Sequence, residues 1–216
     1  MITEPNKKEW LWTIAKIVYL YKFFDMINQV TVFCASSTQA ADVYKQEARQ
    51  LGTILAEHAV KCYYGGGRVG LMGELANSML EHHGHIVGII PQFMVDEGWD
   101  NDKVEEIVVP DMQIRKQKLM QLADAIVALP GGCGTLEELM EAITARQLGL
   151  IKVPIVLVNV CGFFDPLIAM LERAVKEKFM RNEHLSLWSV VTDASQVLSA
   201  IENAPSIENA RGIAAM

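Results

Sequence analysis

The sequence has 216 residues, of which 51% are hydrophobic, and a net charge of −7; this size and composition predict one globular domain with a sizeable core. The acidic balance argues against binding to duplex nucleic acid, which depends on lysine and arginine to neutralise phosphates, although a local basic cluster could still hold a small anion. The four cysteines (Cys34, Cys62, Cys133 and Cys161) show no CxxC spacing, and no signal peptide is evident, so we expect reduced thiols in a cytoplasmic protein and no zinc site.

Residues 1–28 are expected to form an amphipathic helical extension, because apolar residues recur there at helical spacing. Lys16, Lys22 and Asp25 interrupt the apolar runs, which are too short to span a bilayer. The polar face is poor in lysine and arginine, which disfavours membrane contact. Packing against the domain or against a second subunit is the simpler expectation, and membrane association or recruitment by a partner is an alternative.

From residue 29 to residue 204, short apolar segments alternate with segments of helical periodicity. The apolar segments, expected to be strands, are 29–35, 61–64, 85–91, 104–109, 125–130, 153–160 and 188–191. The helices are expected over 39–59, 71–83, 111–124, 135–149 and 165–179 and from Asp193 onward, with 92–103 irregular. Continuous apolar strands between amphipathic helices predict a doubly wound α/β fold, a parallel sheet with helices on both faces. Residues 205–216 are expected to be a frayed tail.

Three loops rich in small residues follow predicted strands, at 35–38, 65–73 and 130–134. In doubly wound folds, ligands bind outside the carboxyl ends of the strands, at the point where the strand order reverses. We therefore expect the three loops to meet at one ligand site.

The third loop contains Gly131, Gly132 and Gly134 and leads into a helix expected to begin at Thr135. Glycines let backbone N–H groups approach a phosphate, and a helix N-terminus adds further N–H groups and a favourable dipole. The loop is not a Walker P-loop, since no Lys-Ser/Thr pair follows it, and residues 65–70 match the dinucleotide pattern poorly. A nicotinamide cofactor is therefore disfavoured. The histidines at 82, 83 and 85 fall at a helix end and predict no metal site.

Thr135 and Glu138 allow two interpretations. A T-x-x-E sequence at a helix start is typical of a capping box, which would be purely structural. A carboxylate beside a phosphate loop could instead activate water or stabilise positive charge on a sugar. Glu137 is expected to be a solvated helix residue. Arg115 and Lys116 place two cations near the start of the preceding helix, which is mildly unfavourable there and hints at an anionic partner.

Five segments together resemble the LOG (Lonely Guy) family of cytokinin-activating phosphoribohydrolases. They are GGGRVGLMG (65–73), MQIRKQKLM (112–120), ADAIVALPGGCGTLEELMEAIT (123–144), QLG (147–149) and NVCGFFDPL (159–167). The similarity runs from about Val30 to Phe179, and PGGxGTxxE preceded by an Arg-Lys pair is highly specific. The resemblance implies a Rossmann-like homodimer that hydrolyses the N-glycosidic bond of a nucleoside 5′-monophosphate, either AMP or an N6-substituted relative, without metal or cofactor.

The resemblance also implies roles for individual residues. Arg115 and Glu138 take the catalytic places. The positions expected to bind substrate are Lys116, Gly131, Gly132, Gly134, Thr135, Thr144 and Glu97, and we place Ser36, Gly66 and Gly67 of the other loops in the same site. Members are often labelled lysine decarboxylase-like, but that chemistry needs pyridoxal phosphate and a Schiff-base lysine, and no lysine here stands out for it.

The chain departs from the family pattern at four places. Ala35 replaces a glycine, a glycine usual soon after it is absent from 37–44, Cys133 replaces an aromatic residue, and Ala145 replaces a tryptophan beside Arg146. These changes affect the expected base pocket or dimer contact and leave Arg115 and Glu138 in place. The alternative is a non-catalytic carrier of a phosphorylated ligand, like the molybdenum-cofactor carriers.

Overall fold

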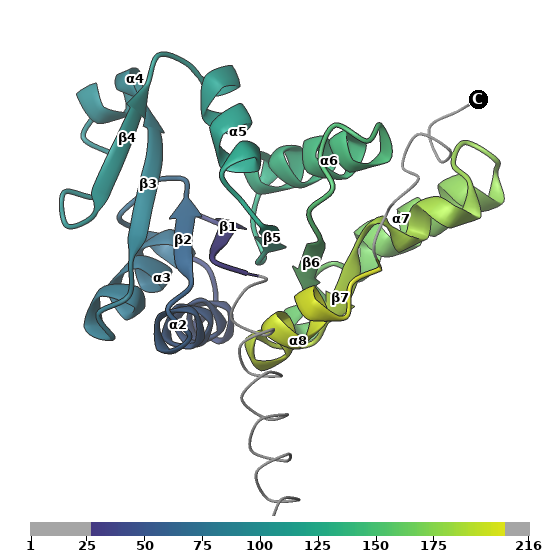
Figure 1. Ribbon diagram of the computed structural model, residues 1–216, viewed down its shortest axis with the longest axis horizontal. Coiled ribbons are helices and arrows are strands. Elements are labelled where there is room, and N and C mark those ends of the chain that lie inside the picture. Colours follow the sequence, from purple (N-terminus) through teal and green to yellow (C-terminus); the bar gives the residue numbers. More distant parts are fainter. Residues whose placement is uncertain (1–26, 206–216) are drawn as a thin grey trace, which may run out of the picture.

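A computed structural model describes residues 27–205, which form a seven-stranded, entirely parallel sheet with helices on both faces (Figure 1). The strands are β1 (Gln29–Phe33), β2 (Lys61–Tyr64), β3 (Ile86–Pro91), β4 (Glu105–Val109), β5 (Ala125–Ala128), β6 (Ile155–Val158) and β7 (Ser189–Val191). Their order is β4-β3-β2-β1-β5-β6-β7. The chain thus builds outward from β1 to one edge and then restarts beside β1 with β5, which confirms the doubly wound fold. The expected N-terminal helix within 1–28 and the tail after Pro205 lie almost wholly outside the described residues.

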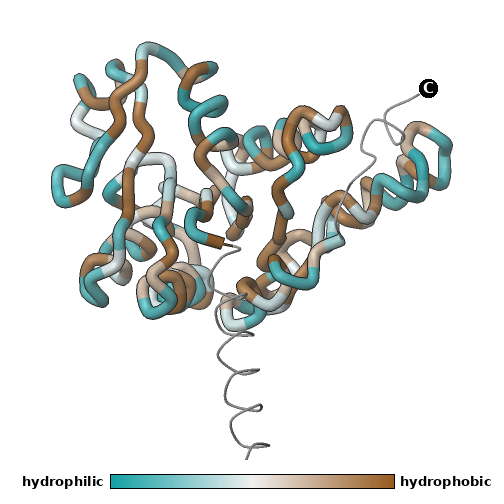
Figure 2. Tube along the Cα trace, in the orientation of Figure 1, coloured by the Kyte–Doolittle hydropathy of each residue, from teal (hydrophilic) through white to brown (hydrophobic). Residues whose placement is uncertain are grey.

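The helices divide between the two faces of the sheet. Those on one face are α2 (Asp42–Glu57), α3 (Gly70–Glu81) and α8 (Val197–Glu202), and those on the other are α5 (Met112–Gln121), α6 (Cys133–Gln147) and α7 (Asp165–Lys176). Alternate strand residues serve the two resulting cores: Val32 packs with the first set of helices and Phe33 with the second. Hydrophobic residues follow the strands through the centre of the molecule (Figure 2).

Short helices complete the described chain. They are α4 (Gln92–Asp96) and the 3₁₀ turns η1 (Val160–Gly162), η2 (Asn182–Leu187) and η3 (Ala194–Gln196). The segment 92–103 was expected to be irregular, which is wrong for α4. That helix has only five residues, too few for a periodic pattern to show in the sequence.

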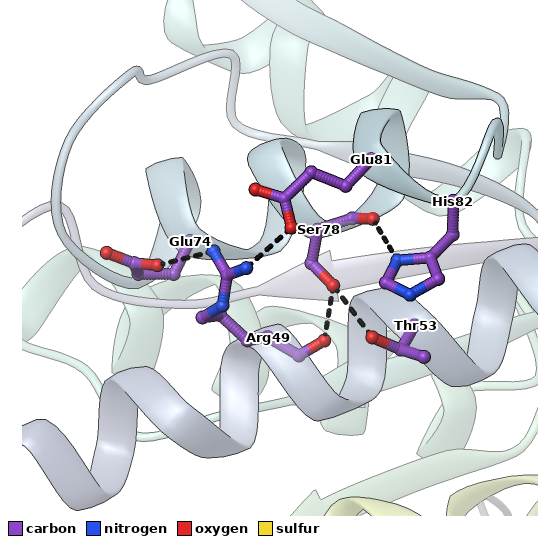
Figure 3. A network of polar contacts seen from close by, with 6 residues as sticks. All are labelled: Arg49, Thr53, Glu74, Ser78, Glu81 and His82. Atoms are coloured by element: carbon purple, nitrogen blue, oxygen red, sulfur yellow. Dashed lines mark hydrogen bonds and ion pairs between the residues drawn. The ribbon is translucent and has the colours of Figure 1, made fainter.

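Helices α2 and α3 pack very closely, and a polar network crosses their contact (Figure 3). A Cβ atom at Gly52 would lie 2.8 Å from the Leu75 carbonyl oxygen, so this position on α2 accommodates only glycine without movement. The Ser78 hydroxyl donates to the Arg49 carbonyl oxygen (2.6 Å), and the Arg49 guanidinium pairs with Glu74 (3.2 Å) and with Glu81 (2.5 Å). This contact fixes α3, whose N-terminus borders the candidate site.

Candidate active site

The three small-residue loops meet at the carboxyl ends of β1, β2 and β5, as predicted. The Ala35 N–H after β1 donates to the Pro130 carbonyl after β5 (3.3 Å), and the Ala35 carbonyl accepts from the Met72 N–H at the start of α3 (3.1 Å). Strands β1 and β5 are the neighbours between which the strand order reverses. The loops therefore surround the switch point, where doubly wound folds bind ligands.

A cavity of about 450 Å³ opens between the loops after β1 and β2 and the segment after β3. Its lining residues are Ser36, Gly65, Gly67, Arg68, Val69, Met72, Ile90, Met94, Gly98, Trp99 and Arg115. Apolar side chains make up most of one wall, whereas Arg115 and Arg68 provide positive charge. Such a cavity suits a ligand with an apolar part and an anionic part.

The Arg115 side chain is buried at the base of this cavity, with 5% of the residue exposed. Asp111 begins helix α5 as predicted, since its side chain accepts a hydrogen bond from the Ile114 N–H (2.8 Å). From the first turn of α5 the Arg115 guanidinium donates to the carbonyls of Ile89 (2.9 Å) and Gly65 (3.3 Å). A Cβ atom at Gly65 would overlap the guanidinium, so glycine there makes room for it.

The Arg115 guanidinium makes its third hydrogen bond to Glu138: Nη1 donates to Glu138 Oε1 at 2.6 Å. Glu138 is buried, with 7% of the residue exposed. Burial raises the pKa of Glu138, while the charge and the hydrogen bond of Arg115 oppose that shift. Of the two interpretations of Thr135 and Glu138, the capping box is wrong. Helix α6 begins at Cys133 with Gly132 as its N-cap, so Thr135 lies inside the first turn and Glu138 binds Arg115 instead.

Lys116 is held by carboxylates of the chain itself. Its ammonium group lies 2.5 Å from Glu137 Oε1 and 2.8 Å from Glu141 Oε2, and this pairing raises the pKa of Lys116. Glu137 is exposed, as expected of a solvated helix residue, and it is also an ion-pair partner of Lys116. The adjacent cations Arg115 and Lys116 suggested an anionic partner. In the structure both bind glutamates of α6: Lys116 pairs with two of them, and Arg115 pairs with Glu138.

The three glycines of the third loop lie in different environments. A Cβ atom at Gly131 would collide with the buried Thr135 side chain, so Gly131 is needed for packing. At Gly132 and Gly134 an added Cβ would meet nothing within 4 Å, and neither residue has a positive φ. Nothing within the described chain requires these two glycines. Close approach of a ligand to the first turn of α6 would require them.

The other predicted site residues are placed as follows. Ser36 and Gly67 line the cavity next to Arg115. Gly66 is buried, with φ +81°, and supports the turn without lining the cavity. Glu97 is exposed at the end of α4, outside the lining, although the two residues that follow it belong to the lining.

Thr144 lies in a different place, in a groove of about 630 Å³ along helices α5 and α6. The groove residues are Gln113, Gln117, Met120, Gln121, Glu137, Met140, Glu141, Thr144, Ala145, Leu148, Leu150 and Ile151. Thr144 is six residues beyond Glu138, or about 9 Å along the helix axis, and does not line the Arg115 cavity.

Several lining residues were not predicted from the sequence, notably Arg68, Met94 and Trp99. Arg68 stands within the glycine loop at 65–73, where its charge was a usable signal. Trp99 lies in a segment without clear periodicity, so no pattern pointed to it. Beneath the site, burial raises the pKa of the Cys34 thiol well above its ordinary value, and this cysteine stays protonated.

Comparison with known proteins gives consistent matches. A sequence-family model described as "Possible lysine decarboxylase" matches residues 72–201. Cytokinin riboside 5′-monophosphate phosphoribohydrolase LOG7 of Arabidopsis thaliana is 41% identical over 156 residues, covering 71% of each chain. Probable cytokinin riboside 5′-monophosphate phosphoribohydrolase LOGL9 of Oryza sativa subsp. japonica is 38% identical over 176 residues, covering 81% of this chain and 78% of the relative.

Among solved structures, the molybdenum cofactor carrier protein of Chlamydomonas reinhardtii superposes with a TM-score of 0.65 at 21% identity, over 82% of this chain and 98% of the carrier. The molybdenum cofactor binding protein of Rippkaea orientalis gives 0.61 at 20% identity, over 82% of this chain and 96% of its own. At these identities the likeness establishes the Rossmann-like fold alone. Within residues 27–205, no helix has the length and apolar character needed to cross a membrane.

Proposed function

Because the chain belongs to the LOG family of nucleotide phosphoribohydrolases, we propose that it hydrolyses the N-glycosidic bond of a nucleoside 5′-monophosphate, releasing a free base and ribose 5-phosphate. The family model's decarboxylase description does not fit relatives named for phosphoribohydrolase activity. The observation that carries the proposal is the buried Arg115–Glu138 pair, whose arginine lines a cavity at the switch point.

Glu138 and Arg115 are the proposed catalytic residues. Cleavage of a ribosyl C–N bond passes through a state with positive charge on the sugar, which a nearby carboxylate stabilises, and the same carboxylate can orient the attacking water. Three hydrogen bonds hold the Arg115 guanidinium in one place. We infer that it keeps Glu138 ionised and correctly oriented and that it meets the substrate at the base of the cavity.

The proposed phosphate site is the start of α6. Gly132 and Gly134 leave room for a phosphate at its free N–H groups, and Gly131 and Thr135 shape the loop beneath. Binding at this remote end of the substrate would orient the scissile bond. Ser36, Gly66, Gly67, Lys116 and Glu97 are the further positions proposed to bind or position substrate.

The cavity wall supports an N6-substituted purine as the preferred base. Met72, Met94 and Trp99 give this wall an apolar character, and Trp99 is more than half exposed. An apolar N6 substituent would bury this surface, whereas the amino group of AMP would not. We propose that N6-isopentenyl-AMP is used in preference to AMP.

The test is chromatography of the purified protein after incubation with AMP and with N6-isopentenyl-AMP. We expect free base and ribose 5-phosphate, and a loss of at least about 100-fold in kcat for Glu138→Gln and for Arg115→Ala, typical of removing one preorganised charged group. Glu172→Gln, which changes an exposed carboxylate on α7, is the control and should keep full activity. Intact nucleotides in every wild-type sample would contradict the proposal and favour a binding protein.

We further propose a homodimer in the cytoplasm. The groove along α5 and α6 exposes Leu148 (51%) and Leu150 (74%) beside Met120 and Met140, an apolar surface that a second copy would cover. In such a dimer Thr144 would face the partner. All four cysteines are free thiols, which supports a reducing compartment.

A further inference from the structure

Arg146, in the last turn of α6, is a buried cation that the proposed chemistry does not use. Only 2% of the residue is exposed. Its Nη1 donates to the Leu187 carbonyl (2.9 Å) and its Nη2 to the Pro205 carbonyl (3.3 Å), while Nε has no hydrogen-bond partner. Its contacts in the described chain are therefore neutral carbonyls.

No carboxylate of the described residues forms an ion pair with Arg146. A guanidinium group keeps its proton at any physiological pH, so Arg146 carries a full charge with no counter-ion among residues 27–205. Burial lowers the pKa of Arg146, which reflects the cost of that charge away from water. Buried charges in proteins are normally paired or bound to a ligand.

Arg146 lines a cavity of about 180 Å³ at the opposite edge of the sheet from the candidate active site. Its lining residues are Ile27, Asp124, Arg146, Lys152, Pro154, Ile201, Glu202, Ala204 and Pro205. Asp124 and Pro154 immediately precede β5 and β6, and Ile27 lies just before β1. The cavity therefore faces the amino ends of these three strands. It is thus separate from the cavity at the carboxyl ends.

Two cations and two carboxylates line this cavity, and the other contacts of each group determine what it offers a ligand. Lys152 adds a second cation to its lining. Asp124 is already engaged, since its Oδ2 accepts from the N–H groups of Asn28 and Gln29, both at 3.0 Å. Burial raises the pKa of Glu202, so its carboxyl group accepts a proton more readily than an ordinary glutamate.

We propose that this cavity is a second ligand site, which binds a small oxyanion of the phosphate or carboxylate class with Arg146 as its main ligand and Lys152 at its rim. The planar guanidinium matches the geometry of such an anion, and each Nη group has a second N–H beyond the one that it donates to a carbonyl. The inference does not depend on the proposed hydrolase activity.

Inorganic phosphate is the probe, titrated by calorimetry and by thermal unfolding in a chloride buffer. Because phosphate is also expected at the glycine loop, every variant carries Gly132→Asp, which places a carboxylate in that loop. We expect one phosphate per chain and a rise of about 5 °C in Tm at saturation. Adding Arg146→Gln should weaken binding at least tenfold, whereas Arg173→Gln, on the exposed side of α7, should not change it.

Ala204→Asp provides a second variant in case Arg146→Gln does not fold. Ala204 lines the cavity, so the new carboxylate would take the place of the anion. We expect a higher Tm without phosphate and no further response to phosphate. The inference is overturned if phosphate does not bind in the Gly132→Asp background, if Arg146→Gln binds it unchanged, or if Ala204→Asp keeps the full phosphate response.

Discussion

At the scale of single residues, Glu138 lies between two opposing influences. Burial favours its neutral form, and the Arg115 guanidinium at 2.6 Å favours its ionised form. Desolvation is the larger effect, so the pKa lies above that of an ordinary glutamate. In the proposed mechanism only the ionised form stabilises the developing charge, and the protonation of this one group therefore sets the acid limit of activity.

We expect kcat/KM to fall as pH decreases through the Glu138 pKa, with a midpoint above the ordinary glutamate value of about 4.3. Arg115→Gln removes the cation that favours the carboxylate, so it should raise the Glu138 pKa further. NMR titration of ¹³C-labelled glutamate measures this pKa in both proteins. An unchanged or lower Glu138 pKa in the Arg115 variant would contradict the assignment.

The roles of individual residues were only partly predictable from the sequence. The family motif predicted Arg115 and Glu138 as the two catalytic residues, and a hydrogen bond joins them in the structure. The pairing of Glu137 with Lys116 was not predictable, because it depends on how α5 and α6 pack across 21 residues of chain. Arg146 could not be recognised as buried either, since an arginine in the last turn of a helix is ordinarily exposed.

At the scale of helices, two glycines have opposite environments. Gly52 on α2 faces the Leu75 carbonyl with no room for a Cβ atom, whereas Gly134 in the first turn of α6 has nothing within 4 Å. Alanine is the better helix former by about 1 kcal/mol. Packing therefore explains the first glycine, and ligand binding is proposed to explain the second.

We expect Gly52→Ala to lower the free energy of unfolding by about 1–2 kcal/mol, because overpacking the α2–α3 contact outweighs the gain in helix propensity. Gly134→Ala, the matched comparison, should raise the free energy of unfolding by up to about 1 kcal/mol while weakening substrate binding. Urea unfolding measures the free energy of unfolding of both variants, and KM reports substrate binding by Gly134→Ala. A stabilised Gly52→Ala, or a Gly134→Ala variant with unchanged KM, would refute the corresponding explanation.

Helix boundaries show a similar limit of sequence-based prediction. The N-cap of α5 at Asp111 and the end of α6 before Gly149 were predictable from local residue types. The start of α6 was not, since a glycine N-cap followed by Cys133 and Gly134 carries no typical start signal, and the T-x-x-E sequence two residues later resembled one.

At the scale of the whole molecule, alternating strands and helices predicted the doubly wound sheet and the meeting of three loops at one edge. The pattern did not predict the order of the strands on each side of β1, which depends on tertiary packing. It also gave no indication of the groove along α5 and α6 or of the cavity around Arg146, because each collects residues from distant parts of the chain.

The proposed dimer is tested by the mass in solution. One chain has a mass of 24.0 kDa, and we expect the wild-type protein to show twice that value. Leu150→Glu, together with Leu148→Glu, places two charges in the apolar groove and should give a monomer. Val43→Glu, an exposed apolar residue of α2 on the other sheet face, should leave the dimer intact. A dimer that survives both leucine changes would exclude this face.

The two outer strands of the sheet also limit how copies of the chain can associate. At one edge β4 begins with Glu105 and Glu106, and at the other β7 has only three residues. Charged or very short edge strands resist the addition of a further strand from another molecule, which is a common route to aggregation. Neither edge is suited to joining two sheets into one. Self-association is thereby directed to the helical surfaces, and an isologous contact there, as in the proposed dimer, would close as a pair and would not propagate into a fibre.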